Sequence, residues 1–251
     1  MGFFDSLSHR FEGRGRTALY AVLGAVALVA LIIVFSWWRE SRADEARRAL
    51  GKAIEIADTP VVTGTPQPGD TGPTFKSEQE RAQRAVEEFQ KIQKTYGSPY
   101  SDIARYFAAV NLLTIERDKG LSELEAVSRS DNKEVAARAR FAIAQADEAA
   151  GKYGDAASIY EQLLSDKDKT VTENVLKLRL AAVYEKQGKR DEAANLLFQM
   201  VSDARKVQDK DGKPPQESTV IHAAADKLQE LSPERYAQLP KEQPADNAPP
   251  F

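Results

Sequence analysis

The fold is decided by two similar stretches, FAIAQADEAAGKYGDAASIYEQLL at residues 141–164 and LRLAAVYEKQGKRDEAANLLFQMV at residues 178–201. Aligned with each other, they superpose Gly151 on Gly188 at a spacing of about 37 residues, which is typical of helical-hairpin repeats. On both sides of each glycine, apolar residues recur every three or four positions. This pattern predicts two antiparallel helices joined by a glycine-containing turn, and its repetition predicts an all-α solenoid.

Weaker copies of the same pattern lie upstream. Ala85, Phe89 and Ile92 stand in the same relation to one another as Ala156, Tyr160 and Leu163. The distance between these two sets leaves room for one degenerate copy, whose apolar face would be Leu121, Leu124 and Val127. The sequence therefore predicts about four helical hairpins. The stretch ESTVIHAAADKLQEL at residues 217–231 would add the capping helix that the exposed end of a repeat array needs.

The repeats resemble those of the tetratricopeptide family across residues 39–231. The resemblance rests on Tyr184, Gly188, Ala193 and Leu197 in one copy, and on Gly151, Ala156 and Tyr160 in the other. Glycine ends the first helix, a small alanine lets two helices approach closely, and the larger residue fills the space between repeats. The early tryptophan of the family pattern is absent, and residues 165–169 insert charged residues into one repeat. Other helical-hairpin arrays therefore stay open as an alternative.

An uncharged apolar run, TALYAVLGAVALVALIIVFSWW, occupies residues 17–38. A hydrocarbon core of about 30 Å requires roughly 20 apolar residues in a helix, so this run predicts one transmembrane helix. Trp37 and Trp38 at its end favour the headgroup region. A cleaved secretory signal is the alternative, but it would have a shorter apolar core and small residues at a cleavage site.

The remaining segments follow from composition. The sequence predicts a short basic tail over residues 1–16, the transmembrane helix over residues 17–38, a repeat domain over residues 39–231 with a flexible loop at residues 58–76, and a disordered proline-rich tail over residues 232–251. Basic residues flank the run on both sides, with Arg10, Arg14 and Arg16 before it and Arg39, Arg42, Arg47, Arg48 and Lys52 after it. Taken alone, the positive-inside count slightly favours a cytoplasmic domain.

Composition argues against most kinds of chemistry. The 251-residue chain has a net charge of -3, which gives no electrostatic footprint for nucleic acid. It contains no cysteine and two histidines, one of which precedes the apolar run, so neither a zinc site nor a Ser-His arrangement is expected in the domain. We therefore expect no enzyme activity, no cofactor, no metal and no small-molecule substrate. Proteins or peptides are the expected partners.

The resemblance to the tetratricopeptide family implies a partner-binding groove along the first helix of each pair. At these positions the sequence places Arg105, Ala109, Leu112, Gln145, Glu148, Leu178, Ala182 and Glu185. Packing within the array is the alternative role for each of these residues. The lysine and asparagine set with which some family members bind a terminal carboxylate is not found.

The whole layout resembles that of bacterial inner-membrane proteins that accompany the secretion translocon. That resemblance implies a single-pass membrane scaffold whose domain lies in the periplasm, with translocon subunits or periplasmic chaperones as partners. The alternatives are an envelope scaffold for cell division or outer-membrane assembly, and an adaptor that faces the cytoplasm. Residues 89–112 do resemble repeats of outer-membrane assembly factors, but those proteins are anchored by a lipidated cysteine that this chain lacks.

Overall fold

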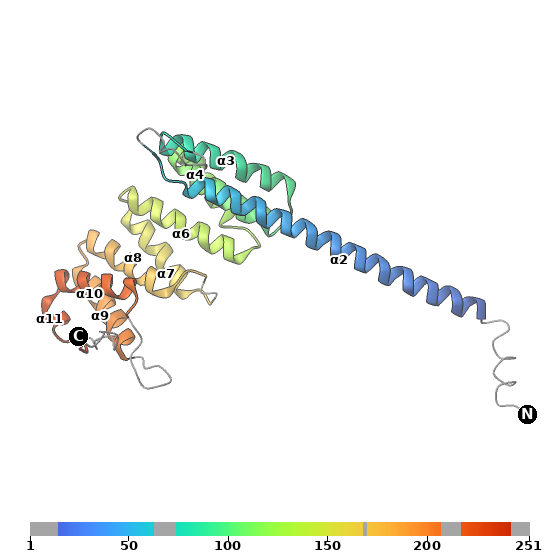
Figure 1. Ribbon diagram of the computed structural model, residues 1–251. Coiled ribbons are helices and arrows are strands. Elements are labelled where there is room, and N and C mark those ends of the chain that lie inside the picture. Colours follow the sequence, from blue (N-terminus) through green and yellow to red (C-terminus); the bar gives the residue numbers. More distant parts are fainter. Residues whose placement is uncertain (1–14, 63–73, 168–169, 207–216, 242–251) are drawn as a thin grey trace, which may run out of the picture. The chain divides into compact units, whose positions relative to one another are not determined.

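The computed structural model describes residues 15–62, 74–167, 170–206 and 217–241, and these are mainly helical (Figure 1). Among them, the only β pairing is an isolated bridge between Val61 and Phe75. The chain divides into two compact units, Met1–Glu55 and Ile56–Phe251. The predicted all-α fold is confirmed.

Helix α2 (Gly15–Asp58) contains the apolar run and continues without a break through residues 39–57. The side chains of residues 24–38 are exposed, with Leu31 at 69% and Trp37 at 73% of their full accessibility. Within the described residues, α2 is the one helix whose length and composition would allow it to cross a membrane. Beyond the run, the Arg42 guanidinium lies 5.6 Å from the centre of the Trp38 ring. The transmembrane span stays a prediction.

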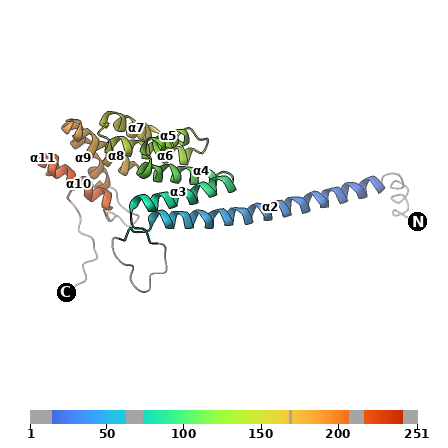
Figure 2. The same cartoon turned by 90° about the horizontal axis from the view of Figure 1, so that it is seen from above.

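The second unit is a series of helices in which each packs against the next (Figures 1 and 2). They are α3 (Glu78–Thr95), α4 (Tyr100–Ile115), α5 (Arg117–Val127), α6 (Lys133–Ala149), α7 (Tyr153–Ser165), α8 (Glu173–Lys186), α9 (Arg190–Lys206), α10 (Thr219–Leu231) and α11 (Pro233–Tyr236). Short connections between packed neighbours make the hairpins α4–α5, α6–α7 and α8–α9 antiparallel. The prediction of a tetratricopeptide-like solenoid is confirmed.

Small residues at the helix crossings and large residues between them build the core. Ala156 of α7 and Ala193 of α9 are completely buried, as the repeat pattern predicts. Tyr160 fills the space among α6, α7 and α8, and Leu197 fills the equivalent space among α8, α9 and α10. Each apolar cluster thus joins one hairpin to the next, so the stability of a repeat depends on its neighbours.

The two repeated glycines end their helices in the same way. Gly151 has φ 75° and Gly188 has φ 77°, a left-handed conformation that glycine adopts without steric cost. After α6, the backbone N–H of Lys152 donates to the carbonyl of Asp147, and after α8 that of Lys189 donates to the carbonyl of Tyr184. These bonds form the Schellman motif, which satisfies carbonyls that the helix end leaves unpaired.

Gly120 is a glycine in the interior of a helix. In the sequence, Lys119–Gly120 resembles a helix stop, but α4 ends at Ile115 and Gly120 lies inside α5. A Cβ atom at Gly120 would lie 2.7 Å from the backbone nitrogen of Leu113. This glycine therefore permits a close approach of α5 to α4.

Hydrogen bonds also connect successive hairpins. The first residue of α5, Arg117, donates to the carbonyl of Ala146 near the end of α6. The first residue of α9, Arg190, donates to the carbonyls of Glu230 and Leu231 at 3.1 and 2.9 Å. In both cases an arginine at the start of a second helix donates to carbonyls at the end of the next first helix.

Helix α10 packs against α8 and α9 at the end of the array, where a capping helix was predicted. The segment that follows differs from the expectation of a tail from Ser232. Residues 233–236 form α11, and Leu239 is buried in the same cluster as Leu228 and Leu231, because its apolar side chain covers the end of the core. The rest of that predicted tail, residues 242–251, and most of the predicted loop, residues 63–73, lie outside the described residues.

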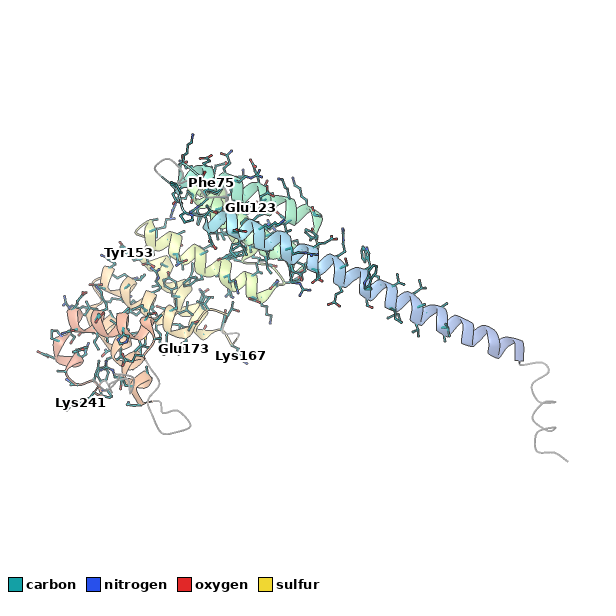
Figure 3. All side chains as sticks on the ribbon, viewed as in Figure 1. Phe75, Glu123, Tyr153, Lys167, Glu173 and Lys241 are labelled. Carbon is teal, nitrogen blue, oxygen red and sulfur yellow. The ribbon has the colours of Figure 1, made fainter. Side chains whose placement is uncertain are left out.

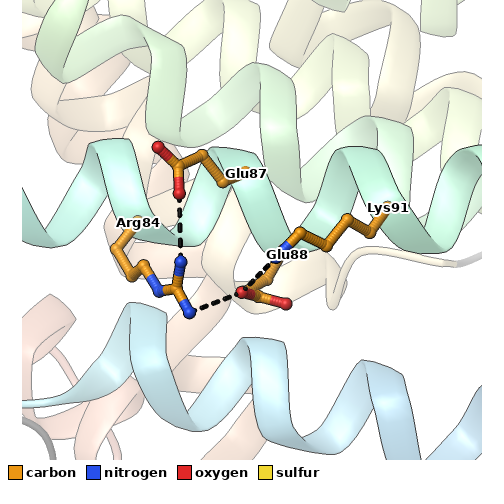
Figure 4. Close-up of polar contacts among 4 residues, drawn as sticks. All are labelled: Arg84, Glu87, Glu88 and Lys91. Atoms are coloured by element: carbon orange, nitrogen blue, oxygen red, sulfur yellow. Dashed lines mark hydrogen bonds and ion pairs between the residues drawn. The ribbon is translucent and has the colours of Figure 1, made fainter.

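One side of α3 carries a cluster of partly exposed charged residues (Figure 4). Arg84 contacts Glu87 at 3.1 Å and Glu88 at 2.9 Å, and Lys91 contacts Glu88 at 2.9 Å. These pairs have the spacings of neighbours on a helix surface, where each contributes about 0.3–0.5 kcal/mol. Such charges keep the helix soluble and carry no specific chemistry.

Candidate functional site

The candidate site is one face of the first helices α4, α6 and α8, here called the first-helix face. It consists of Tyr106, Val110 and Leu113 in α4, Phe141, Gln145 and Glu148 in α6, and Leu178, Ala182 and Glu185 in α8. All nine side chains are half-buried, so each packs against its own repeat and also contacts solvent. A partner chain lying across the three helices would meet them in rows.

The buried sides of the helices establish which residues are equivalent. Matching buried residues are Ala104 and Ala109 in α4, Ala139 and Ala144 in α6, and Leu176 and Ala181 in α8. Counted from these residues, the first row of the face is Tyr106, Phe141 and Leu178. Val110, Gln145 and Ala182 make up the second row, and Leu113, Glu148 and Glu185 the third.

The structure distributes the eight predicted groove residues between this face and other environments. Gln145, Glu148, Leu178, Ala182 and Glu185 lie on the first-helix face. Ala109 and Leu112 are 1% and 4% exposed and belong to the core, which is the packing role that the sequence left open as an alternative. Arg105 is half-buried and its guanidinium contacts Glu123 of α5 at 3.0 Å.

Sequence reasoning missed the α4 members Tyr106, Val110 and Leu113. Equivalent residues are fewer positions apart between α4 and α6 than between α6 and α8. The repeat length of the two clear copies therefore does not identify the equivalent positions in α4. The buried alanines Ala104 and Ala109 carry the missing signal, because a small residue at a helix crossing marks the packed side.

Glu148 lies at the centre of a polar contact on this face. Its carboxylate accepts a hydrogen bond from the Tyr160 hydroxyl at 3.0 Å and another from Arg179 of α8 at 3.4 Å. Burial raises the pKa of Tyr160 above its ordinary value of 10.0, and the charge and hydrogen bond of Glu148 raise it further. The phenol therefore stays protonated and acts as a donor, which fixes the position of the carboxylate.

The equivalent residue in the next repeat, Glu185, also pairs with the following first helix. Its carboxylate lies 3.0 Å from the ammonium of Lys227 in α10. Hydrogen bonds to Glu185 and Glu230 raise the pKa of Lys227. The two acidic residues of the third row thus connect α6 to α8 and α8 to α10, and these contacts fix the positions of their carboxylates.

The first row of the face is apolar and aromatic. Burial raises the pKa of Tyr106, and the positive charge of Arg138 in α6 partly offsets this increase. The Phe141 ring centre lies 5.8 Å from that of Tyr160 beneath it. Half-buried aromatic rings offer apolar contact area at low entropic cost, so they are suited to binding a side chain of a partner.

The described residues contain no group of three or more His, Asp or Glu side chains that could hold a metal ion. His222 of α10 is half exposed, and its Nδ1 lies 3.4 Å from Glu217. This single pair is a surface contact next to a structural carboxylate.

A comparison with protein families agrees with the repeat fold. A family model described as a tetratricopeptide repeat-like domain matches residues 111–213. A crystal structure from Podosopora anserina, described as putative kinesin light chain nearly identical TPR-like repeats, has 21% sequence identity to this chain and a TM-score of 0.48. That similarity covers 63% of this chain and 80% of the other. No curated protein matches the chain. Domains of this repeat type are typically non-enzymatic scaffolds that bind proteins or peptides.

Proposed function

We propose that this protein is a membrane-anchored, non-enzymatic scaffold that binds a protein or peptide partner on the first-helix face. One observation carries the proposal: Tyr106, Phe141 and Leu178 repeat an apolar, half-buried contact on three successive helices. An extended or helical segment that presents apolar side chains at matching intervals would bury them against this row. Burying apolar surface contributes about 25 cal/mol per Å².

The charges around the row would then select among partners. Glu148 and Glu185 are held by contacts with Tyr160, Arg179 and Lys227, so a partner meets fixed charges instead of mobile ones. Fixed charges contribute more to specificity and to encounter rates than to affinity. The apolar first row provides the affinity in this proposal.

The anchor is the apolar part of α2. Its exposed leucine, isoleucine and valine side chains would be unfavourable in water over such a length, and a lipid bilayer would cover them. We place the protein in the bacterial inner membrane with one span, and its repeat domain in the periplasm. The partners that this location allows are translocon subunits and periplasmic chaperones. The resemblance of the whole layout supports this location against the weak positive-inside count.

Crosslinking in intact membranes tests the proposed binding face. The variant Ala182→Arg puts a long cation into the second row without removing any hydrogen bond, and Asn195→Arg adds the same side chain at an exposed position of α9. Ala182→Arg should reduce the yield of crosslinked partners by about tenfold, which corresponds to roughly 1.4 kcal/mol of binding free energy. Asn195→Arg should leave the yield unchanged.

Thermal melts of both variants distinguish lost binding from lost folding. Equal partner yields for two well-folded variants would contradict the first-helix face as the binding surface. The location is tested separately by fusing a reporter enzyme to Phe251. The reporter is one that becomes active only after export from the cytoplasm. An inactive fusion, with a cytoplasmic reporter active at the same position, would contradict the periplasmic placement.

A further inference from the structure

A second, basic pocket lies outside the first-helix face, at the connections between hairpins. Its walls come from the α5–α6 connection, from the first half of α6 and from the α7–α8 connection, and its volume is about 420 Å³. The residues that matter here are Arg129, Ser130, Lys133, Arg140, Asp166 and Lys167. Figure 3 labels Lys167 in the α7–α8 connection. None of these residues belongs to the first-helix face, so the inference does not rest on the function proposed above.

The charge of the pocket lining is strongly unbalanced. Leaving Lys133 aside, Arg129, Arg140 and Lys167 contribute three positive charges, and Asp166 is the one carboxylate among the lining residues. This contrasts with the charged side of α3, where bases and acids alternate. An excess of cations around a concave site attracts an anionic group and raises its local concentration.

Arg140 shows which kind of anion the pocket accepts. Its Nη2 atom lies 2.9 Å from a carboxylate oxygen of Asp166, so a carboxylate already occupies one side of the guanidinium. The Nε atom of the same guanidinium is buried and has no hydrogen-bond partner within the described part of the chain. A buried donor without an acceptor is unfavourable. A carboxylate placed to accept from Nε and Nη2 together would remove that cost, because guanidinium groups pair with carboxylates in this bidentate manner.

We propose that this basic pocket binds an acidic segment of a partner protein, and that a carboxylate of that segment competes with Asp166 for Arg140. Arg129 and Lys167 at the rim would contact further acidic side chains of the same segment. A carboxylate fits the observations better than a phosphate does, because the group that Arg140 already holds is a carboxylate. In the free protein, Asp166 acts as an internal competitor that keeps the affinity moderate.

The test measures binding of fluorescent peptides to the full-length chain in a nonionic detergent. One peptide alternates glutamate with glycine, and its control replaces every glutamate with glutamine. The glutamate peptide should bind in a salt-dependent manner, and the glutamine peptide should not. Arg140→Gln should weaken binding by about tenfold or more, and the double variant Arg129→Gln with Lys167→Gln by several-fold. Asp166→Asn should strengthen binding, because it removes the competing charge while keeping a similar shape.

The opposite effects of Arg140→Gln and Asp166→Asn are the decisive readout, since a merely structural ion pair would make both variants behave alike. Arg84→Gln, from the charged surface of α3, is the matched control and should change nothing. The double rim variant keeps the test valid if Arg140→Gln fails to fold. Weaker binding by Asp166→Asn, equal loss with Arg84→Gln, or binding of the glutamine peptide would overturn the proposal. Inorganic phosphate is also added at a concentration equal to that of the carboxylate groups of the peptide. Displacement of the peptide by this phosphate would overturn the proposal in favour of a general anion site.

Discussion

The hydroxyl of Tyr160 donates a hydrogen bond to Oε2 of Glu148 at 3.0 Å, and this contact joins a fully buried ring to the first-helix face. Arg179 of the next hairpin approaches the other oxygen of the same carboxylate. The residue that fills the space between repeats therefore also positions a charged group of the candidate site. The core packing and the geometry of the candidate site are coupled at this point, because a change in the core packing would release the carboxylate.

Replacing Tyr160 with phenylalanine should destabilise the domain by about 1 to 2 kcal/mol. A hydrogen bond to a charged group contributes about 1.5–3 kcal/mol, and Glu148 keeps Arg179 and some solvent contact after the change. Urea unfolding followed by circular dichroism gives the difference. Tyr184→Phe is the matched control, since its hydroxyl donates to Glu161 at 2.8 Å in an exposed contact and its loss should cost about 0.5 kcal/mol or less. Equal effects of the two variants would show that burial of the Tyr160 contact adds nothing.

Stability should also fall in alkaline solution because of the tyrosines. Burial, together with a hydrogen bond to Glu161, raises the pKa of Tyr184 from 10.0 to about 12. Because the unfolded chain loses this proton first, the contribution of Tyr184 is complete below pH 10 and is lost as the pH rises towards 12. Relative to Tyr184→Phe, which lacks the titrating group, the parent protein should lose stability over this range. Urea midpoints of both proteins just below pH 10 and near pH 12 provide the measurement, and a constant difference between them would contradict the raised pKa.

Two glycine substitutions should have opposite effects. Gly120→Ala introduces a Cβ that would lie 2.7 Å from the backbone of Leu113 and 3.0 Å from that of Leu112, so the cost should be about 1–3 kcal/mol. Gly154→Ala, in the first turn of α7, meets no atom within 4 Å and should be neutral or stabilise by up to about 1 kcal/mol. Thermal melts under one set of conditions compare them. If Gly120→Ala melts at the same temperature as the parent protein or higher, α5 and α4 do not approach as closely as described.

The features that could be predicted from sequence are those with a local cause. Gly151 and Gly188 mark helix ends because few other residues adopt a positive φ at low cost, and their spacing gives the repeat. Helix α4 ends at Ile115, and its C-cap residue is Glu116 with φ -137° instead of a glycine, so this marker is missing there. That is why the predicted face included the core residues Ala109 and Leu112.

The contacts between hairpins could not be predicted in the same way. Glu148 and Arg179 are far apart in sequence, and whether they meet depends on how α6 crosses α8. Asp166 likewise reaches Arg140 only through the path of the α7–α8 connection. Spacing along one helix identifies which side is buried, but pairs between helices depend on crossing geometry that short sequence patterns do not contain.

Arg190→Ala should destabilise the end of the array by about 1 to 2 kcal/mol, because it removes hydrogen bonds to two carbonyls at the end of α10. Those carbonyls have no partner within the helix, and the guanidinium also complements the negative end of the helix dipole. Arg84→Ala is the control: it removes the exposed contacts with Glu87 and Glu88 and should cost about 0.5 kcal/mol or less. Amide hydrogen exchange should locate the effect, with faster exchange in α10 and little change in α4. Exchange that speeds up equally in both helices would mean that Arg190 supports the whole array and not its last helix in particular.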